Sequence, residues 1–150
     1  MLAIGCDQAG YGLKLEILKY LDEKEIAYKD CGTCSADAVD YPVYAKAVVQ
    51  EILSGNAEKG ILICGTGIGM SITANRYKGI RAALCGDCFS AEATRLHNDA
   101  NILCMGARVT GAGLAIKITE TFLNTPFSGA ERHARRIRLI EEEAGTEGEE

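Results

Sequence analysis

The sequence ILICGTGIGM, residues 61–70, decides the fold expected for this chain. Its first four residues, Ile61 to Cys64, form a short apolar run rich in β-branched side chains, which is typical of a buried parallel strand. The next five, Gly65 to Gly69, include three glycines, which let the backbone turn sharply and expose its amides. A helical pattern then begins at Met70. A strand, a glycine loop and a helix in this order predict a site for a negative charge.

The alternation of strand and helix continues along the whole chain. The predicted strands are Leu2–Cys6, Ile26–Cys31, Ile61–Cys64, Ile80–Cys85 and Ile102–Met105. The predicted helices are Gly12–Glu23, a segment from Pro42 to Ile52, Met70–Asn75, a segment from its N-cap Asp87 to His97, Leu114–Leu123 and Glu131–Glu142. This order predicts a single α/β domain built on a five-stranded parallel sheet with helices on both faces.

Ligands of such open sheets bind outside the carboxyl ends of the strands. The residues that directly follow the predicted strands are therefore the candidate site residues. They are Asp7 and Gln8, Thr33, Cys64 to Gly69, Asp87 and Arg108.

Cys64 is the candidate base, because it stands where the strand ends and the loop begins. Backbone amides at such a turn favour the thiolate form of a cysteine, and the same amides can hold an oxyanion. The alternative is that Cys64 is a small buried apolar residue, as free cysteines often are. The glycine spacing GTGIG matches neither the dinucleotide fingerprint nor a Walker loop, so a nucleotide-binding module is disfavoured.

The net charge of −5 comes from the end of the chain, because residues 141–150 hold six glutamates and no basic residue. Without them 15 acidic residues face 16 basic ones, so nucleic acid is not an expected partner. We expect a domain over residues 1–140 and an acidic, disordered tail over residues 141–150. No apolar run is long enough to cross a membrane, and no signal peptide precedes the first strand, so a cytoplasmic location is expected.

Seven cysteines without a secretion signal indicate free thiols. Cys31 and Cys34, and Cys85 and Cys88, form two CxxC pairs that could supply four zinc ligands. Some fifty residues of strand and helix separate the pairs, which is unlike a short zinc knuckle. We therefore expect no metal.

The other candidates for acid–base chemistry and anion binding lie near helix ends. His97 ends a helix, where it could cap the terminus or move protons near neutral pH. His133 lies among arginines, which favours an electrostatic role. Arg132 and Arg136 are four residues apart and share one helix face, so they form either a solvated face or a grip for phosphate.

A series of motifs along the chain resembles the type B ribose-5-phosphate isomerases, whose relatives include the allose-6-phosphate and galactose-6-phosphate isomerases. The motifs are GCDQAGYGLK, DCGT, VDYP, GILICGTGIGMSITAN, GIRAAL, HNDANIL, GARV and ERHARR, in that order, and they span residues 1 to about 140. The resemblance implies a Rossmann-like α/β/α sandwich, assembled as a homodimer or homotetramer, and a reaction of the pentose phosphate pathway.

The resemblance also implies a role for each matching position. Cys64 would move a proton between C2 and C1 of the sugar, and the loop carrying Gly65, Gly67 and Gly69 would stabilise the enediolate. His97 and Thr66 would open the furanose ring. Asp7, Tyr41 and Asn98 would contact sugar hydroxyls. Arg108, Arg132 and Arg136 would bind the phosphate, with part of that set coming from the neighbouring subunit, and Gln8 would also contact the substrate. No cofactor is implied.

Two positions depart from the family pattern. Gln8 stands where the family usually has a histidine that helps to hold phosphate, and glutamine cannot become cationic. Gly86 stands where a larger polar residue is common. The sequence therefore leaves open another sugar phosphate, such as allose 6-phosphate, and a sugar-phosphate-binding protein without turnover.

Overall fold

The structure, a computed structural model, describes residues 1–143. Its strands are β1 (Leu2–Cys6), β2 (Tyr28–Asp30), β3 (Lys59–Cys64), β4 (Ala82–Leu84) and β5 (Ile102–Gly106). Its helices are α1 (Tyr11–Glu23), α2 (Tyr41–Leu53), α3 (Ile68–Ala74), α4 (Cys88–Asn98), α5 (Ala112–Asn124) and α6 (Glu131–Glu143). The predicted five-stranded parallel sheet is confirmed.

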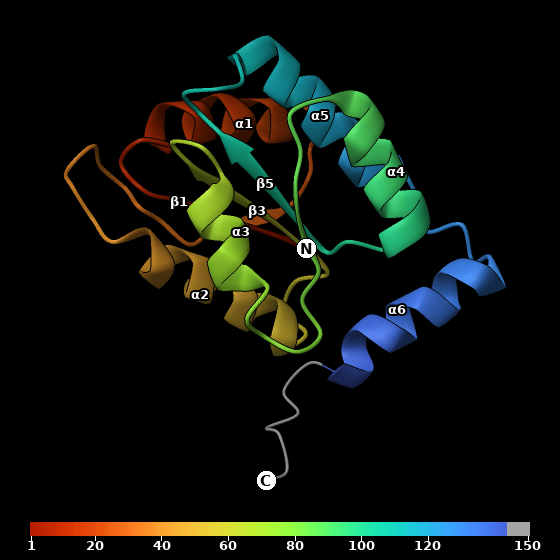
Figure 1. Ribbon diagram of the computed structural model, residues 1–150. Coiled ribbons are helices and arrows are strands. Elements are labelled where there is room, and N and C mark those ends of the chain that lie inside the picture. Colours follow the sequence, from red (N-terminus) through yellow and green to blue (C-terminus); the bar gives the residue numbers. More distant parts are fainter. Residues whose placement is uncertain (144–150) are drawn as a thin grey trace, which may run out of the picture.

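The strand order is β2-β1-β3-β5-β4, so β3 lies at the centre of the sheet. One apolar core packs α1, α4 and α5 against one face, and a second packs α2 and α3 against the other (Figure 1). The side chains of β3 alternate between the two cores: Ile61 and Ile63 enter the first, whereas Leu62 and Cys64 enter the second. Both faces of the sheet are covered, which explains the uninterrupted apolar run in the sequence.

The two edge strands are shorter than predicted, because the amides at their amino ends bond elsewhere. The amide of Ile26 donates to the carbonyl of Leu21 at the end of α1 (2.9 Å). The amide of Ile80 donates to Tyr77 in a turn (3.1 Å), and that of Arg81 donates to the side chain of Asn101 (2.9 Å). The sheet ladder therefore begins later in both strands.

Helix α6 lies outside both cores and packs against α4 (Figure 1). It runs to Glu143, so the first three residues of the segment predicted as a disordered tail are helical. Glu141 is held in place by an ion pair with Arg81, with Nη1 2.6 Å from Oε1. Residues 144–150 of the predicted tail lie outside the described residues.

Candidate active site

Cys64 ends β3 with its side chain 5% exposed, beside the loop that leads into α3. The amide of Gly67 donates to its Sγ atom at 3.1 Å. Gly67 has φ +80°, and a Cβ there would lie 2.6 Å from Leu84 and 2.8 Å from the backbone of Met105, so only glycine fits. The fold thus aims a main-chain N–H group at the thiol, as the sequence predicted for this loop.

Asp7 and Gln8 follow β1, next to the end of β3. From β1 the chain goes to β2 on one side, and from β2 it crosses to β3 on the other side of β1. The strand order therefore changes direction between β1 and β3, and open α/β sheets bind ligands at such a switch point. The amide of Asp7 donates to the carbonyl of Ile63 (3.2 Å), and its Oδ1 accepts from the amide of Gly10 (3.0 Å). Asp7 is 7% exposed, so this carboxylate is fixed at the end of β1, next to the strand that ends in Cys64.

Gln8 uses its side-chain oxygen to hold the loop before α2, because Oε1 accepts from the amide of Val39 at 3.0 Å. Tyr41 begins α2 just beyond this loop and is 40% exposed. Its ring lies against Gly69, where a Cβ would lie 2.6 Å from Cζ of the tyrosine. The predicted contact residues Gln8, Tyr41 and Gly69 therefore lie on one side of the Cys64 loop.

Arg108 and Thr66 lie on the loop as well. The amide of Arg108 donates to the carbonyl of Gly65 (3.0 Å), and its side chain passes beside Gly65, with Cδ 3.5 Å from the place of a Cβ. The hydroxyl of Thr66 accepts from the amide of Ile68 at 3.2 Å. A cavity of about 320 Å³ opens beside the loop, and Thr66, Gly86 and Val109 are among its lining residues.

His97 and Asn98 lie far from Cys64 within one chain. Helix α4 starts after the carboxyl end of β4 and returns to the amino end of β5 (Figure 1). There the carbonyl of Asn101 accepts from the amide of Gly60 at the start of β3 (2.8 Å). Cys64 is at the other end of β3, roughly 13 Å away at 3.3 Å per residue. Arg132 and Arg136 belong to α6, which packs at this same distant end of α4, and both are exposed.

His133 was predicted to be electrostatic rather than catalytic. It is buried, at 7% exposure, and stacks on His97 with ring centroids 4.4 Å apart and planes 18° from parallel. Burial lowers the pKa of His133, and the neighbouring Arg132, His97 and Arg136 lower it further. The burial of His133 could have been predicted from the helical period, because successive residues of a helix are turned by about 100° and His133 therefore faces away from Arg132.

The two CxxC pairs lie at opposite edges of the sheet. Cys31 and Cys34 follow β2 at one edge, whereas Cys85 and Cys88 follow β4 at the other edge. Four strand spacings separate these edges, roughly 19 Å. Within residues 1–143, no cluster of three or more His, Cys, Asp or Glu side chains could hold a metal ion. No helix in that range is long and apolar enough to span a bilayer.

These features define a single-domain parallel α/β protein in which a glycine loop presents main-chain amides to a cysteine at the carboxyl edge of the central strand. The chain belongs to the Ribose/Galactose Isomerase family, whose family model matches residues 2–140. The predicted resemblance is thereby confirmed.

Solved and curated relatives cover nearly the whole chain. The crystal structure of ribose 5-phosphate isomerase from Thermotoga maritima is 56% identical, with a TM-score of 0.92, over 94% of this chain and 97% of that one. Ribose-5-P isomerase B of Listeria innocua is 47% identical over 94% of this chain and 95% of its own length. Ribose-5-phosphate isomerase B of Escherichia coli is 44% identical over 93% of each chain. These likenesses support the Rossmann-like fold expected from the sequence.

Proposed function

We propose that this protein is an aldose–ketose isomerase that interconverts ribose 5-phosphate and ribulose 5-phosphate. The observation that carries the proposal is the Gly67 amide, which donates to the Cys64 sulfur at 3.1 Å. Removing a proton next to a carbonyl needs a base and donors aimed at the developing oxyanion. The relatives named ribose-5-phosphate isomerase support this substrate.

The proposed reaction starts from the open-chain aldose. The Cys64 thiolate takes the proton from C2, and the electron pair of that C–H bond forms the C1–C2 double bond while the carbonyl π pair moves to O1. The loop amides stabilise the resulting enediolate oxygen. The thiol then returns its proton to C1, and the O2 hydroxyl proton is transferred to O1, directly or through solvent, as the C2 carbonyl forms. No metal or cofactor takes part in these steps.

We infer that the active site is completed by a second copy of the chain. A sugar phosphate in contact with Cys64 cannot reach His97 of the same chain, because the length of β3 separates them. Around the loop, apolar side chains are exposed that a second copy would cover: Ile68 (50%), Ile72 (61%), Leu84 (45%), Phe89 (81%) and Val109 (72%). A homodimer would bring the partner's helix end and arginines to this rim.

In the assembled site, the residues around Cys64 of one chain and the residues of α4 and α6 from the second copy would bind different parts of the substrate. Asp7 and Tyr41, with Asn98 from the second copy, would contact sugar hydroxyls, and Gln8 would orient the loop before Tyr41. Arg108 from one chain and the exposed arginines of α6 from the other would bind phosphate. His97, with Thr66, would move the proton that opens the furanose ring.

The direct test is turnover of ribose 5-phosphate by the wild type, Cys64→Ala and Cys34→Ala, each with and without EDTA. Cys34 is an exposed thiol outside the loop and serves as the matched control. We expect Cys64→Ala to lose about 10²-fold or more in turnover, with no effect of Cys34→Ala or EDTA. Full activity of Cys64→Ala would refute the proposed base.

One observation favours a second substrate. A Cβ at Gly86 would meet no atom within 4 Å, so the cavity beside Thr66 has room for a longer sugar. Allose 6-phosphate and other hexose phosphates assayed beside ribose 5-phosphate would decide between them. Calorimetric binding without turnover of any of these sugars would instead indicate a binding protein.

A further inference from the structure

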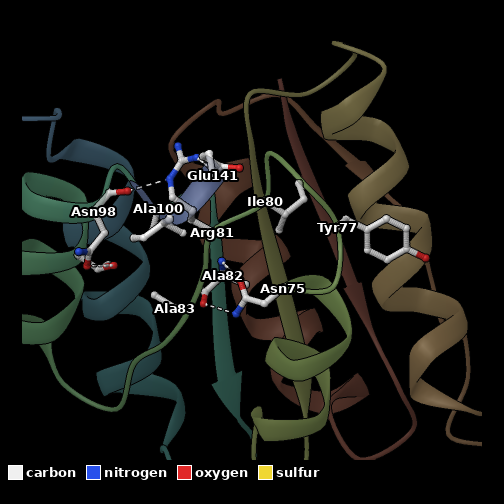
Figure 2. A pocket seen from close by; sticks show the side chains of 11 residues that line it. Asn75, Tyr77, Ile80, Arg81, Ala82, Ala83, Asn98, Ala100 and Glu141 are labelled. Carbon is white, nitrogen blue, oxygen red and sulfur yellow. Dashed lines mark hydrogen bonds and ion pairs between the residues drawn. The ribbon is translucent and has the colours of Figure 1, made fainter. Parts of the chain in front are cut away.

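Arg81, in the motif GIRAAL before β4, joins three segments that are distant in sequence. Its Nε donates to the carbonyl of Asn98 (2.9 Å) and its Nη2 to that of Asp99 (3.0 Å), at the end of α4. Its Nη1 donates to Oε1 of Glu141 (2.6 Å), in the last turn of α6. Figure 2 shows this guanidinium between Asn98 and Glu141, at the rim of a cavity of about 420 Å³.

Glu141 is fixed from a second direction. Its Oε2 accepts from the amide of Gly79 at 3.0 Å, so one carboxylate bridges a main-chain N–H group and the Arg81 guanidinium. The side chains of Arg81 and Glu141 are only 18% and 23% exposed, which limits screening by water. Two charge-assisted contacts to one carboxylate define a single geometry for the end of the helix.

Helix α6 is thereby held near both of its ends. His133, in its first turn, stacks on His97, and Glu141, in its last turn, contacts Gly79 and Arg81. The helix lies outside the two apolar cores, so these contacts set its angle to α4. The angle between α6 and α4 therefore determines where the exposed guanidiniums of α6 lie.

We propose that Arg81 and Glu141 are positioning residues for phosphate binding: their ion pair holds α6 against the end of α4, so that Arg132, Arg136 and the His97–Asn98 segment meet the substrate as one unit. This inference rests on the proposed function of those four residues. Neither Arg81 nor Glu141 touches the substrate in this arrangement. Because α6 lies outside both apolar cores, loss of this ion pair is expected to change binding more than folding.

The test compares Glu141→Ala with Glu142→Ala, which removes the same charge from an exposed neighbour on the same helix. Arg81→Lys is the third variant, because lysine keeps the charge but lacks the planar fork that spans three acceptors. Three quantities are measured: the dissociation constant of inorganic phosphate by calorimetry, kcat and KM for ribose 5-phosphate, and hydrogen exchange of the α6 amides.

We expect Glu141→Ala to weaken phosphate binding and raise KM roughly 10- to 100-fold, the cost of a misplaced binding group, with a smaller change in kcat and faster exchange in α6. Arg81→Lys should fall between it and the wild type, and Glu142→Ala should match the wild type. If Glu141→Ala does not fold, Glu141→Gln, which keeps an acceptor for Gly79, takes its place.

Unchanged phosphate affinity in Glu141→Ala, or an equal loss in Glu142→Ala, would overturn the positioning role. A wild type that binds phosphate without isomerising ribose 5-phosphate would refute the proposed function, and the dissociation constants would still decide the positioning role. A wild type that does not bind phosphate would refute the positioning role itself.

Discussion

The imidazole rings of His97 and His133 stack face to face, with 4.4 Å between their centroids. The His97 ring is exposed at the end of α4, whereas the His133 ring, in the first turn of α6, is buried. The nearby His97 ring lowers the pKa of the buried His133. The contact between the two helices therefore depends on the protonation of His133.

We predict that the protein loses stability as the pH falls below about 6.5. The pKa of His133 is lowered from 6.5 in the folded protein by burial and by Arg132, His97 and Arg136. The unfolded chain therefore binds more protons there, and stability that is present above pH 6.5 decreases as the pH falls through the folded pKa. Thermal unfolding between pH 8 and 5.5 measures this, with His133→Phe as a ring that cannot titrate. An equally steep decline in His133→Phe would assign the effect to another group.

A mixture of two inactive variants should regain activity if the site is shared. Cys64→Ala and His97→Asn are each expected to be nearly inactive alone. After unfolding and refolding together, half of the dimers are hybrids, and each hybrid has one site with both wild-type residues, which gives about a quarter of wild-type activity. Each variant refolded alone is the control. No recovery in a mixture shown to contain hybrids would place His97 in the same site as its own chain's Cys64.

Replacing Lys14 by Met should destabilise the fold. Lys14 is fully buried, its Nζ lies 2.8 and 3.0 Å from the Asp30 carboxylate oxygens, and it also donates to the carbonyl of Thr33. We expect a loss of about 2 kcal/mol in the free energy of unfolding, less than for a fully buried pair, because Asp30 is 31% exposed and can be hydrated.

Urea unfolding measures the effect of Lys14→Met, and Lys29→Met is its matched control. Lys29 is paired with Glu51 but is 53% exposed, so its removal should cost much less than that of Lys14. Equal losses in the two variants would contradict the buried-pair explanation.

Two neighbouring glycines should respond oppositely to alanine. A Cβ at Gly10 would lie 2.5 Å from the carbonyl oxygen of Ile63, on the strand that carries Cys64, so Gly10→Ala should cost about 2 kcal/mol and reduce activity. Gly12 is in α1 with no atom within 4 Å of the added Cβ, so Gly12→Ala should stabilise by about 0.5–1 kcal/mol. Urea unfolding of both variants gives the comparison, and a harmless Gly10→Ala would refute the close approach of α1 to β3.

The local pattern was sufficient to predict the elements, because apolar runs and helical spacing are local properties. The central strands β1, β3 and β5 match their predicted runs within two residues at each end. The edges were harder to predict: whether the amides of Ile26 and Ile80 join the sheet depends on partners in other segments. The strand order also depends on tertiary packing and was not predicted.

The candidate site was predicted in part by the rule that ligands bind at the carboxyl ends of strands. That rule brought together Asp7, Cys64 and Arg108, which the structure places around one loop. The rule did not show that His97 lies far from these residues. A helix between two parallel strands runs back toward the amino ends of the strands, so the position of His97 at the end of its helix could have predicted this. The pairing of Arg81 with Glu141 joins residues sixty positions apart and leaves no periodic trace in the sequence.

The burial of strand thiols has a consequence for chemical labelling. Burial raises the pKa of Cys6 and of Cys85 to about 11, and it also raises the pKa of Cys104. At neutral pH these thiols stay protonated and buried, so they would react slowly with electrophilic reagents. The order in which an alkylating probe modifies the cysteines of this protein would therefore report first on how deeply each thiol is buried, and only then on its role.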